Sequence, residues 1–174
     1  MFKNFIPFAH AQNIFEIDPE FFKKCGVKVL FVDLDNTLDV YDALIPSSDR
    51  PVAYIKKIID SGIKPVLISN NKPKRVSKYA EALGIEFLAS AMKPFAIKIL
   101  KEISNRNLSK DDVMLVGDQM MTDVLAAYHA KIRVCLTEPI FKKDQWTTRI
   151  NRLFDRPIRK HHKKKGNLID WKEK

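Results

Sequence analysis

Two aspartates stand two positions apart in the segment DLDNTL, directly after the apolar run KVLFV. A strand that ends at Asp33 would point its carboxylate into the crevice beyond the sheet, where it could attack phosphorus and hold a cation. Asp35 would reach the same place from the following turn. Two carboxylates this close repel each other, so one keeps a proton unless a cation neutralises the pair. A protonated and an ionised carboxyl group together supply an acid and a nucleophile.

Polar residues near the other predicted strand ends extend this pair. Alone, an Asp-x-Asp pair is more often a turn or a helix cap. Ser69 and Asn70 follow the apolar run PVLI and offer donors to a phosphate oxygen, and Lys93 supplies a cation just before a helix start. Asp118 ends a fourth apolar run, and Asp123 follows one helical turn later. Carboxylates and waters are the ligands that Mg²⁺ prefers. The set favours a Mg²⁺-dependent hydrolase of phosphate monoesters.

Short apolar or β-branched runs alternate with segments of helical periodicity along the chain, which predicts parallel strands joined by helices. The expected strands are 28–33, 65–69, 86–89, 113–117 and 132–136. We therefore expect a Rossmann-like α/β sandwich of about five parallel strands with helices on both faces. Because ligands bind beyond the carboxyl ends of such strands, the polar residues above should meet at one edge.

The 174 residues, 45% of them apolar, fit one folded domain with two flanking segments. Residues 1–27 form a leader with apolar residues at helical spacing, which predicts a helix packed on or near the core; a membrane-surface helix is the alternative. Residues 28–155 form the catalytic domain, and 156–174 a basic C-terminal tail. The run RPIRKHHKKK that opens the tail is typical of a solvated, partly disordered segment, and it could also anchor phosphates.

The charge balance favours anionic partners. The chain has 31 Lys and Arg against 21 Asp and Glu, a formal charge of +10, which suits phosphorylated substrates, anionic lipid or nucleic acid and also keeps a protein soluble. The basic run has no interleaved aromatic residues, which argues against nucleic acid. No apolar run approaches the roughly 20 residues of a membrane span, and the start is a poor secretory signal. With Cys25 and Cys135 in apolar surroundings, we expect a cytoplasmic protein, soluble or peripheral on the inner membrane face.

The motifs, in this order, resemble those of the haloacid dehalogenase (HAD) superfamily of phosphotransferases. The four matching motifs are Asp33-x-Asp35-x-Thr37, Ser69, Lys93 and Gly117-Asp118-x-x-x-Thr122-Asp123. The resemblance covers residues 28–136 and implies an HAD-type fold and a phosphoric monoester hydrolase. It implies that Asp33 forms an aspartyl-phosphate, while Asp35 is the general acid that then deprotonates the hydrolytic water. Asp35 also argues against dehalogenation, since family members that cleave carbon–halogen bonds lack an acid there.

The resemblance also implies how the metal and the phosphoryl group are held. Mg²⁺ would be bound by the Asp33 carboxylate, the backbone carbonyl of Asp35 and Asp118. Asp123 would either be a further ligand or lie in the layer of residues that surrounds the ligands. Ser69 and Lys93 would hold the phosphoryl group. Family members that act on small metabolites carry a cap domain after the first motif or before the third, and this chain has no room for one. We expect an open crevice unless an oligomer partner covers it.

The finer pattern is similar to the capless subclass III group called the YqeG family, related to mitochondrial phosphatidylglycerophosphate phosphatases. The supporting segments are DLDNTL (33–38), SNN (69–71) followed by Arg75-Val76, Ala91-x-Lys93-Pro94 and VGDQMMTDV (116–124). Arg75 itself could meet substrate or be a helix-surface charge. By this resemblance the substrate is a lipid phosphate, phosphatidylglycerophosphate, with the basic run and the aromatic N-terminus holding the crevice at the bilayer. The alternatives are a phosphatase of soluble or nucleic-acid-end monoesters and a non-enzymatic RNA- or ribosome-associated module.

Overall fold

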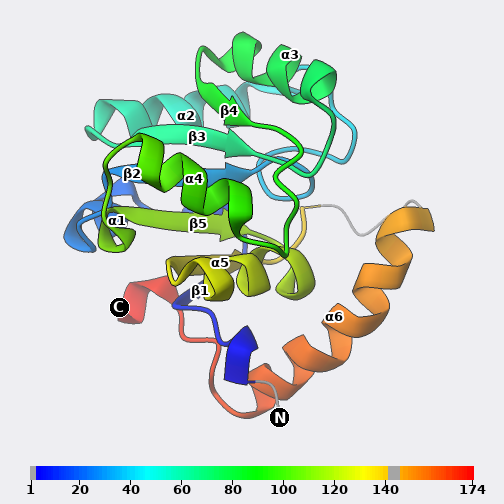
Figure 1. The fold of residues 1–174 in the computed structure, drawn as a ribbon. Helices are drawn as coiled ribbons and strands as arrows, with labels where there is room; N and C mark the ends of the chain where they lie inside the picture. Colours follow the sequence, from blue (N-terminus) through cyan, green and yellow to red (C-terminus); the bar gives the residue numbers. More distant parts are fainter. Residues whose placement is uncertain (1–2, 141–145) are drawn as a thin grey trace.

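A computed structural model describes residues 3–140 and 146–174 of the chain. In these residues six parallel strands form one sheet in the order β1-β6-β5-β2-β3-β4 (Figure 1). The strands are β1 (Ala9–Ala11), β2 (Val29–Asp33), β3 (Lys64–Ile68), β4 (Glu86–Leu88), β5 (Val113–Gly117) and β6 (Arg133–Thr137). The α-helices are α1 (Pro19–Lys24), α2 (Asp49–Asp60), α3 (Pro73–Leu83), α4 (Ile97–Asn105), α5 (Leu125–Ala130) and α6 (Trp146–Lys164). A π-helical turn, Met120–Val124, leads into α5.

Helices cover both faces of the sheet because successive side chains of a strand point to opposite faces. In β2, Leu30 and Val32 pack in one apolar cluster with residues of α1, α2 and α3. Val29 and Phe31 of the same strand pack in the other cluster with residues of α4 and α5. All residues of β2 are buried, as expected for a central parallel strand. The predicted Rossmann-like α/β fold is confirmed, with one strand more than expected.

Because all the strands are parallel, they end at the same edge of the sheet, where Figure 1 shows the arrowheads of β2, β3, β4 and β5. In the register of the sheet Asp33 lies opposite Ile68, and Val32 lies opposite Val116. Ser69 and Asp118 follow β3 and β5 within two residues of these positions. The sheet therefore brings the ends of its three central strands, and the polar residues there, into one crevice.

The N-terminal segment differs from its prediction. Residues 9–11 form edge strand β1, paired with Cys135–Thr137 of β6, where the sequence spacing predicted a helix. The aromatic side chain of Phe22 is fully buried in the core, and so are Ile14 and Ile17. A three-residue strand is too short for its alternation to stand out from helical spacing, and its partner lies far away in the sequence. The segment is thus a structural part of the domain.

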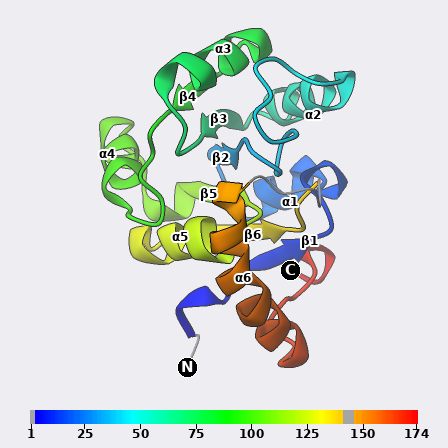
Figure 2. The same cartoon turned by 90° about the vertical axis from the view of Figure 1, so that its right-hand side faces the viewer.

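The C-terminal basic run is helical, where the sequence predicted a solvated, partly disordered tail. It lies in α6, where Asp155, Ile158 and His162 are buried. Beyond the helix, the ring of Trp171 packs against Phe21 with centroids 5.8 Å apart. Among the helices described, none has the length and apolar character needed to span a membrane. Figure 2 shows α6 standing in front of the carboxyl ends of β5 and β6.

Candidate active site

The loop that follows β2 folds back on itself immediately. The backbone N–H groups of Leu38 and Asp39 both donate to the carbonyl of Leu34, at 3.1 Å. The Asp39 carboxylate anchors the loop because it accepts a hydrogen bond from the Tyr79 hydroxyl at 2.7 Å. Burial comes first among the causes that raise the pKa of Tyr79, and the bond to Asp39 adds to it. This tight turn keeps Asp35 next to the strand end.

Lys93 connects two carboxylates of the site. Its Nζ donates to Asp33 Oδ1 at 2.5 Å and to Asp123 Oδ1 at 2.6 Å. Burial would lower the pKa of Lys93, but Asp123 and Asp33 raise it above its usual value. The Asn70 amide holds the Lys93 backbone through reciprocal 2.8 Å bonds, with Nδ2 donating to the carbonyl and Oδ1 accepting from the N–H. Asn70 is thus placed to position Lys93, and its contact with phosphate stays a prediction.

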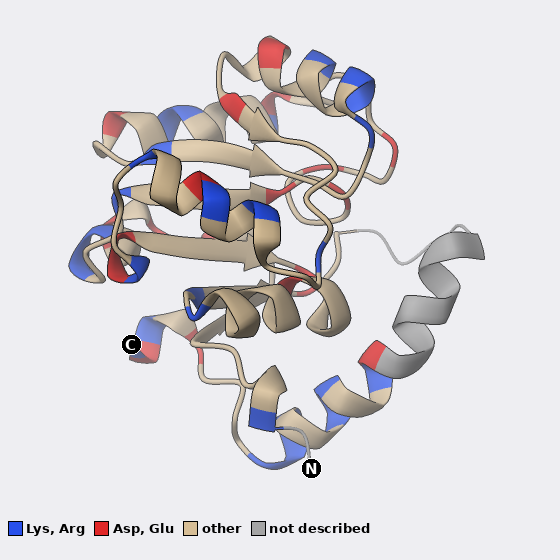
Figure 3. Cartoon of the chain, in the orientation of Figure 1, with Lys and Arg blue, Asp and Glu red and all other residues tan. Residues whose placement is uncertain are grey.

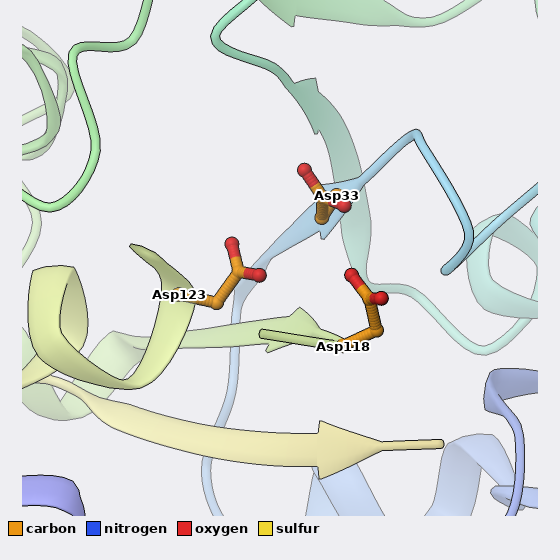
Figure 4. A group of neighbouring side chains, drawn as sticks. All are labelled: Asp33, Asp118 and Asp123. Atoms are coloured by element: carbon orange, nitrogen blue, oxygen red, sulfur yellow. The ribbon is translucent and has the colours of Figure 1, made fainter. Parts of the chain in front are cut away.

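Three buried carboxylates meet at the crevice. Asp33, Asp118 and Asp123 each offer an oxygen within 4.8 Å of the others (Figure 4). The pKa of Asp33 is raised to about 7, and burial is the largest cause. The charge of Lys93 lowers this pKa, while the charges of Asp123 and Asp35 raise it. Burial and the charges of Asp33 and Asp123 raise the pKa of Asp118 well above its usual value. Such a cluster suits a hard divalent cation, since a cation relieves both repulsion and desolvation.

Gly117 explains how the cluster stays so compact. A Cβ atom at this position would overlap the side-chain carbons of Asp123. The Asp123 side chain lies over the end of β5 and is 1% exposed, so it has no free space to move into. Asp123 Oδ2 also accepts a hydrogen bond from the Gln119 backbone N–H at 3.1 Å. Glycine in the Gly-Asp pair of the fourth motif therefore has a steric role, because it leaves room for Asp123, whereas the aspartate has a chemical one.

Asp35 faces a different set of partners from Asp33. Arg75 donates from Nη1 and Nη2 to the two carboxylate oxygens at 2.8 and 2.6 Å, and Asn71 Nδ2 donates to Oδ2 at 2.8 Å. The buried Ser69 hydroxyl lies 3.5 Å from the same oxygen. Sequence reasoning had left Arg75 open between substrate contact and surface charge, and here it holds Asp35. Its place in the first turn of α3, four residues after Asn71, was the available signal.

Helix α6 braces the loop after β5, which the sequence did not indicate. Asp155 accepts hydrogen bonds from the backbone N–H groups of Met120 and Met121. Arg159 donates to the backbone carbonyl of Asp118. Residues more than 30 positions away thus fix the segment that carries Asp118 and Asp123. Nothing local in the basic run could have revealed these contacts.

Comparison with known proteins places the chain in a family. A family model described as HAD-hydrolase-like matches residues 86–146. The probable phosphatase YqeG of Bacillus subtilis (strain 168) is 36% identical over 171 residues, which cover 98% of each chain. The chain belongs to the HAD superfamily, in its YqeG family. Among solved structures, a hypothetical protein from Xanthomonas campestris is 19% identical, with a TM-score of 0.51 over 74% of this chain and 73% of that one. A Listeria monocytogenes protein is 14% identical, with a TM-score of 0.52 over 70% and 88%.

These findings confirm the predicted HAD-type fold and the prediction that this YqeG-family chain is a phosphatase. Within residues 3–140, all of which the structure describes, no cap domain is inserted: a loop joins β2 to α2, and only α3 and β4 separate β3 from the Lys93 loop. All the predicted site residues converge at one edge of the sheet. They are Asp33, Asp35, Ser69, Asn70, Lys93, Asp118 and Asp123.

Gly117→Ala tests the compact geometry of the HAD site. The new methyl group must displace the Asp123 carboxylate from Lys93, so we expect phosphatase kcat/KM to fall by at least about 100-fold. Gly62→Ala is the matched control, because a Cβ there meets no neighbouring atom, although its φ of 86° adds strain. Steady-state kinetics with p-nitrophenyl phosphate measure both. Full activity in folded Gly117→Ala protein would contradict the steric role.

Proposed function

We propose that this HAD phosphatase hydrolyses phosphate monoesters in a Mg²⁺-dependent reaction through an aspartyl-phosphate on Asp33. The contact between Asp33 and the Lys93 ammonium, inside a cluster of buried carboxylates, carries the proposal. A lone anionic nucleophile would repel a phosphate dianion, and positive charge beside it offsets that repulsion. Ser69 and Lys93 are the residues that would hold the transferring phosphoryl oxygens.

The proposed reaction has two steps at phosphorus. The Asp33 carboxylate attacks, the bond from phosphorus to the leaving oxygen breaks, and Asp35 donates a proton to that oxygen. Asp35 then takes a proton from a water molecule that attacks the aspartyl-phosphate, which releases inorganic phosphate and restores Asp33. The hydrogen bonds from Arg75 and Asn71 hold the Asp35 side chain in place beside the strand end.

The donor set fits Mg²⁺. Asp33, Asp118 and Asp123 supply hard carboxylate oxygens, and the raised pKa values of Asp33 and Asp118 record the unfavourable negative charge that a cation would offset. The backbone carbonyl of Asp35 is proposed as a further ligand. When bound, the ion supplies positive charge for the oxygens of the phosphoryl group. The protein residues then hold substrate, nucleophile and acid in one orientation.

Mg²⁺ should stabilise the protein more at alkaline than at acidic pH. The pKa of Asp33 is raised from 3.8 to about 7, so the folded metal-free protein binds a proton that the unfolded chain loses, and its stability falls as pH rises through this window. Near saturation we expect Mg²⁺ to raise Tm by about 5–10 °C at about pH 8, and by much less at about pH 5.5. Differential scanning calorimetry measures the shift.

Asp118→Asn provides the control for this experiment, because it removes one carboxylate without changing the side-chain size. We expect the Mg²⁺-dependent rise in Tm to disappear in this variant. An equal rise at both pH values, or an undiminished rise in Asp118→Asn, would contradict the proposed metal site.

We further propose a lipid phosphate, such as phosphatidylglycerophosphate, as the substrate. Exposed apolar side chains lie on the loops that leave the carboxyl edge of the sheet and at the first residue of α4, and we call them the apolar rim. The apolar rim consists of Leu44, Ile45, Met92, Phe95 and Ile97, which are 49–67% exposed. Met92 flanks the catalytic lysine directly in sequence. Apolar side chains around an open crevice, with cations nearby, fit contact with an anionic bilayer.

In this proposal the apolar rim takes the place of the aromatic N-terminus, which the sequence predicted to hold the crevice at the bilayer together with the basic run. Two of the aromatic N-terminal residues expected to face the bilayer are buried: Phe21 is 6% exposed, and Phe22 is fully buried. The basic face of α6, by contrast, remains exposed near the crevice. We therefore propose peripheral attachment, at the cytoplasmic face, through the rim and α6. A soluble phosphate monoester remains the alternative substrate, since an open crevice admits small molecules as well.

A phosphate-release assay with Mg²⁺ tests substrate and nucleophile together. We expect phosphatidylglycerophosphate in anionic vesicles to be preferred over nucleotides, sugar phosphates and phosphorylated nucleic-acid ends. Asp33→Asn should lower turnover of every substrate by about 10⁴-fold or more, because amide nitrogen cannot replace the carboxylate nucleophile. A preference for a soluble sugar phosphate would overturn the lipid substrate but not the chemistry.

Ile97→Ser isolates the contribution of the apolar rim. It should lower activity on vesicles by about tenfold while p-nitrophenyl phosphate turnover stays within twofold, because only the vesicle reaction needs apolar insertion. Ile59→Ser is the matched control: Ile59 is 47% exposed at the end of α2, at the opposite edge of the sheet. Equal losses in the two variants would argue against membrane contact through the rim.

A further inference from the structure

A second cavity lies between α6 and the carboxyl ends of β1 and β6. Its volume is about 610 Å³, within the range of small-molecule sites. The basic residues that line it are Arg156, Arg159, Lys160 and Lys163. Arg156, Lys160 and Lys163 recur at intervals of four and three residues and therefore share one face of α6. Figure 3 marks the Lys and Arg positions along the described part of this helix. Ile158 and His162, on the other face, are buried.

The positive charge of this cavity is largely uncompensated. Arg156, Lys160 and Lys163 are exposed, and none of them forms an ion pair with another residue of the described chain. Arg159 differs, because it pairs with Glu138 at 3.0 Å and with Asp155 at 3.4 Å. Like charges held on one helix face repel each other, and a bound anion would relieve that repulsion.

Among the described residues that line the cavity, Glu138 is the one carboxylate, and it is already engaged. Glu138 Oε1 lies 3.0 Å from His10 Nε2 and accepts a hydrogen bond from Arg159 at 3.0 Å. The pKa of Glu138 is lowered to about 2, mainly by the hydrogen bond with His10. Burial opposes this shift, and Arg159 adds to it. Its charge is thus balanced within the wall, which leaves the three exposed cations facing the cavity.

The basic cavity adjoins the phosphatase site. A smaller cavity of about 230 Å³ is lined by Asp118, Gln119 and Asp155. The two cavities share Glu138, Pro139, Arg156 and Arg159 in their walls. A molecule whose phosphate lies at Asp118 can therefore extend along α6 without leaving the protein surface.

We propose that the basic cavity is a second anion subsite, which binds a phosphodiester of the same substrate molecule whose terminal phosphate monoester is hydrolysed at Asp33. The inference rests on the proposed phosphatase function and adds to it a second binding point for the substrate. The substrate carries a monoester joined through a short alcohol to a phosphodiester. Arg156, Lys160 and Lys163 bind the diester oxygens, while Arg159 holds the wall and the Asp118 loop together.

This subsite distinguishes substrates by their second charge. A monoester with no other phosphate leaves the cations unpaired and gains nothing from the cavity. A substrate with the additional diester binds at two points, which lowers KM and fixes the approach of the reacting phosphate. The chemistry of the ligand, a phosphate monoanion, is shared by the headgroup of a neighbouring lipid, so the test must separate the two sources.

The test compares two short-chain lipids, kept below the concentration at which they form micelles. Dihexanoyl phosphatidylglycerophosphate carries a monoester and a diester, whereas dihexanoyl phosphatidic acid carries only the monoester. In the triple variant Arg156→Gln, Lys160→Gln, Lys163→Gln, kcat/KM for the first should fall at least about tenfold through KM, and for the second by less than about twofold. Circular dichroism checks that the variant is folded, and the single variant Lys160→Gln gives an intermediate effect.

The control is the triple variant Lys101→Gln, Lys164→Gln, Lys165→Gln, which removes the same charge from exposed positions outside the cavity wall. It should leave the preference between the two lipids unchanged. Equal losses on both lipids, or a loss that appears only in anionic vesicles, would overturn the subsite and assign the cations to general attraction. Absence of turnover of both lipids and of p-nitrophenyl phosphate by the unmodified protein would instead refute the proposed function.

Discussion

The burial of three carboxylates against a single ammonium group is the constraint on which the rest of the structure depends. Asp33, Asp118 and Asp123 gather within 4.8 Å, and Lys93 bonds to two of them. Buried charge of one sign is costly, so the surroundings must hold it in place. The sheet does so by ending its central strands together, and the loop of Lys93 does so through Asn70. The excess of negative charge suits a divalent cation.

Sequence alone predicted the central strands and the residues at their ends, because continuous apolar runs are followed directly by polar side chains. The expected strand 113–117 coincides with β5, and 28–33 exceeds β2 by one residue. Strand β1 and the ordering of α6 were missed, because both depend on partners distant in the sequence. Arg75 was named but not assigned, since a helix-surface charge and a buried partner of Asp35 look alike in the sequence. Long-range contacts leave no local periodicity.

The match to YqeG shows that the chain belongs to a phosphatase family. The structure adds the side chains that surround the open crevice. One side of the carboxyl edge presents apolar side chains, and the other presents the basic face of α6. The same helix fixes the Asp118 loop through Asp155 and Arg159. In our proposal, α6 therefore both binds the substrate and holds the Asp118 loop in place.

The central claim is that Asp33 becomes covalently phosphorylated during turnover. The most direct measurement is rapid acid quenching of the enzyme during turnover with Mg²⁺ and substrate, followed by borohydride reduction and peptide mass spectrometry. An aspartyl-phosphate is reduced by borohydride to homoserine, so the account predicts homoserine at position 33, dependent on substrate and absent in Asp33→Asn. Turnover at full rate with position 33 unmodified, or with the label on Asp35, would contradict it.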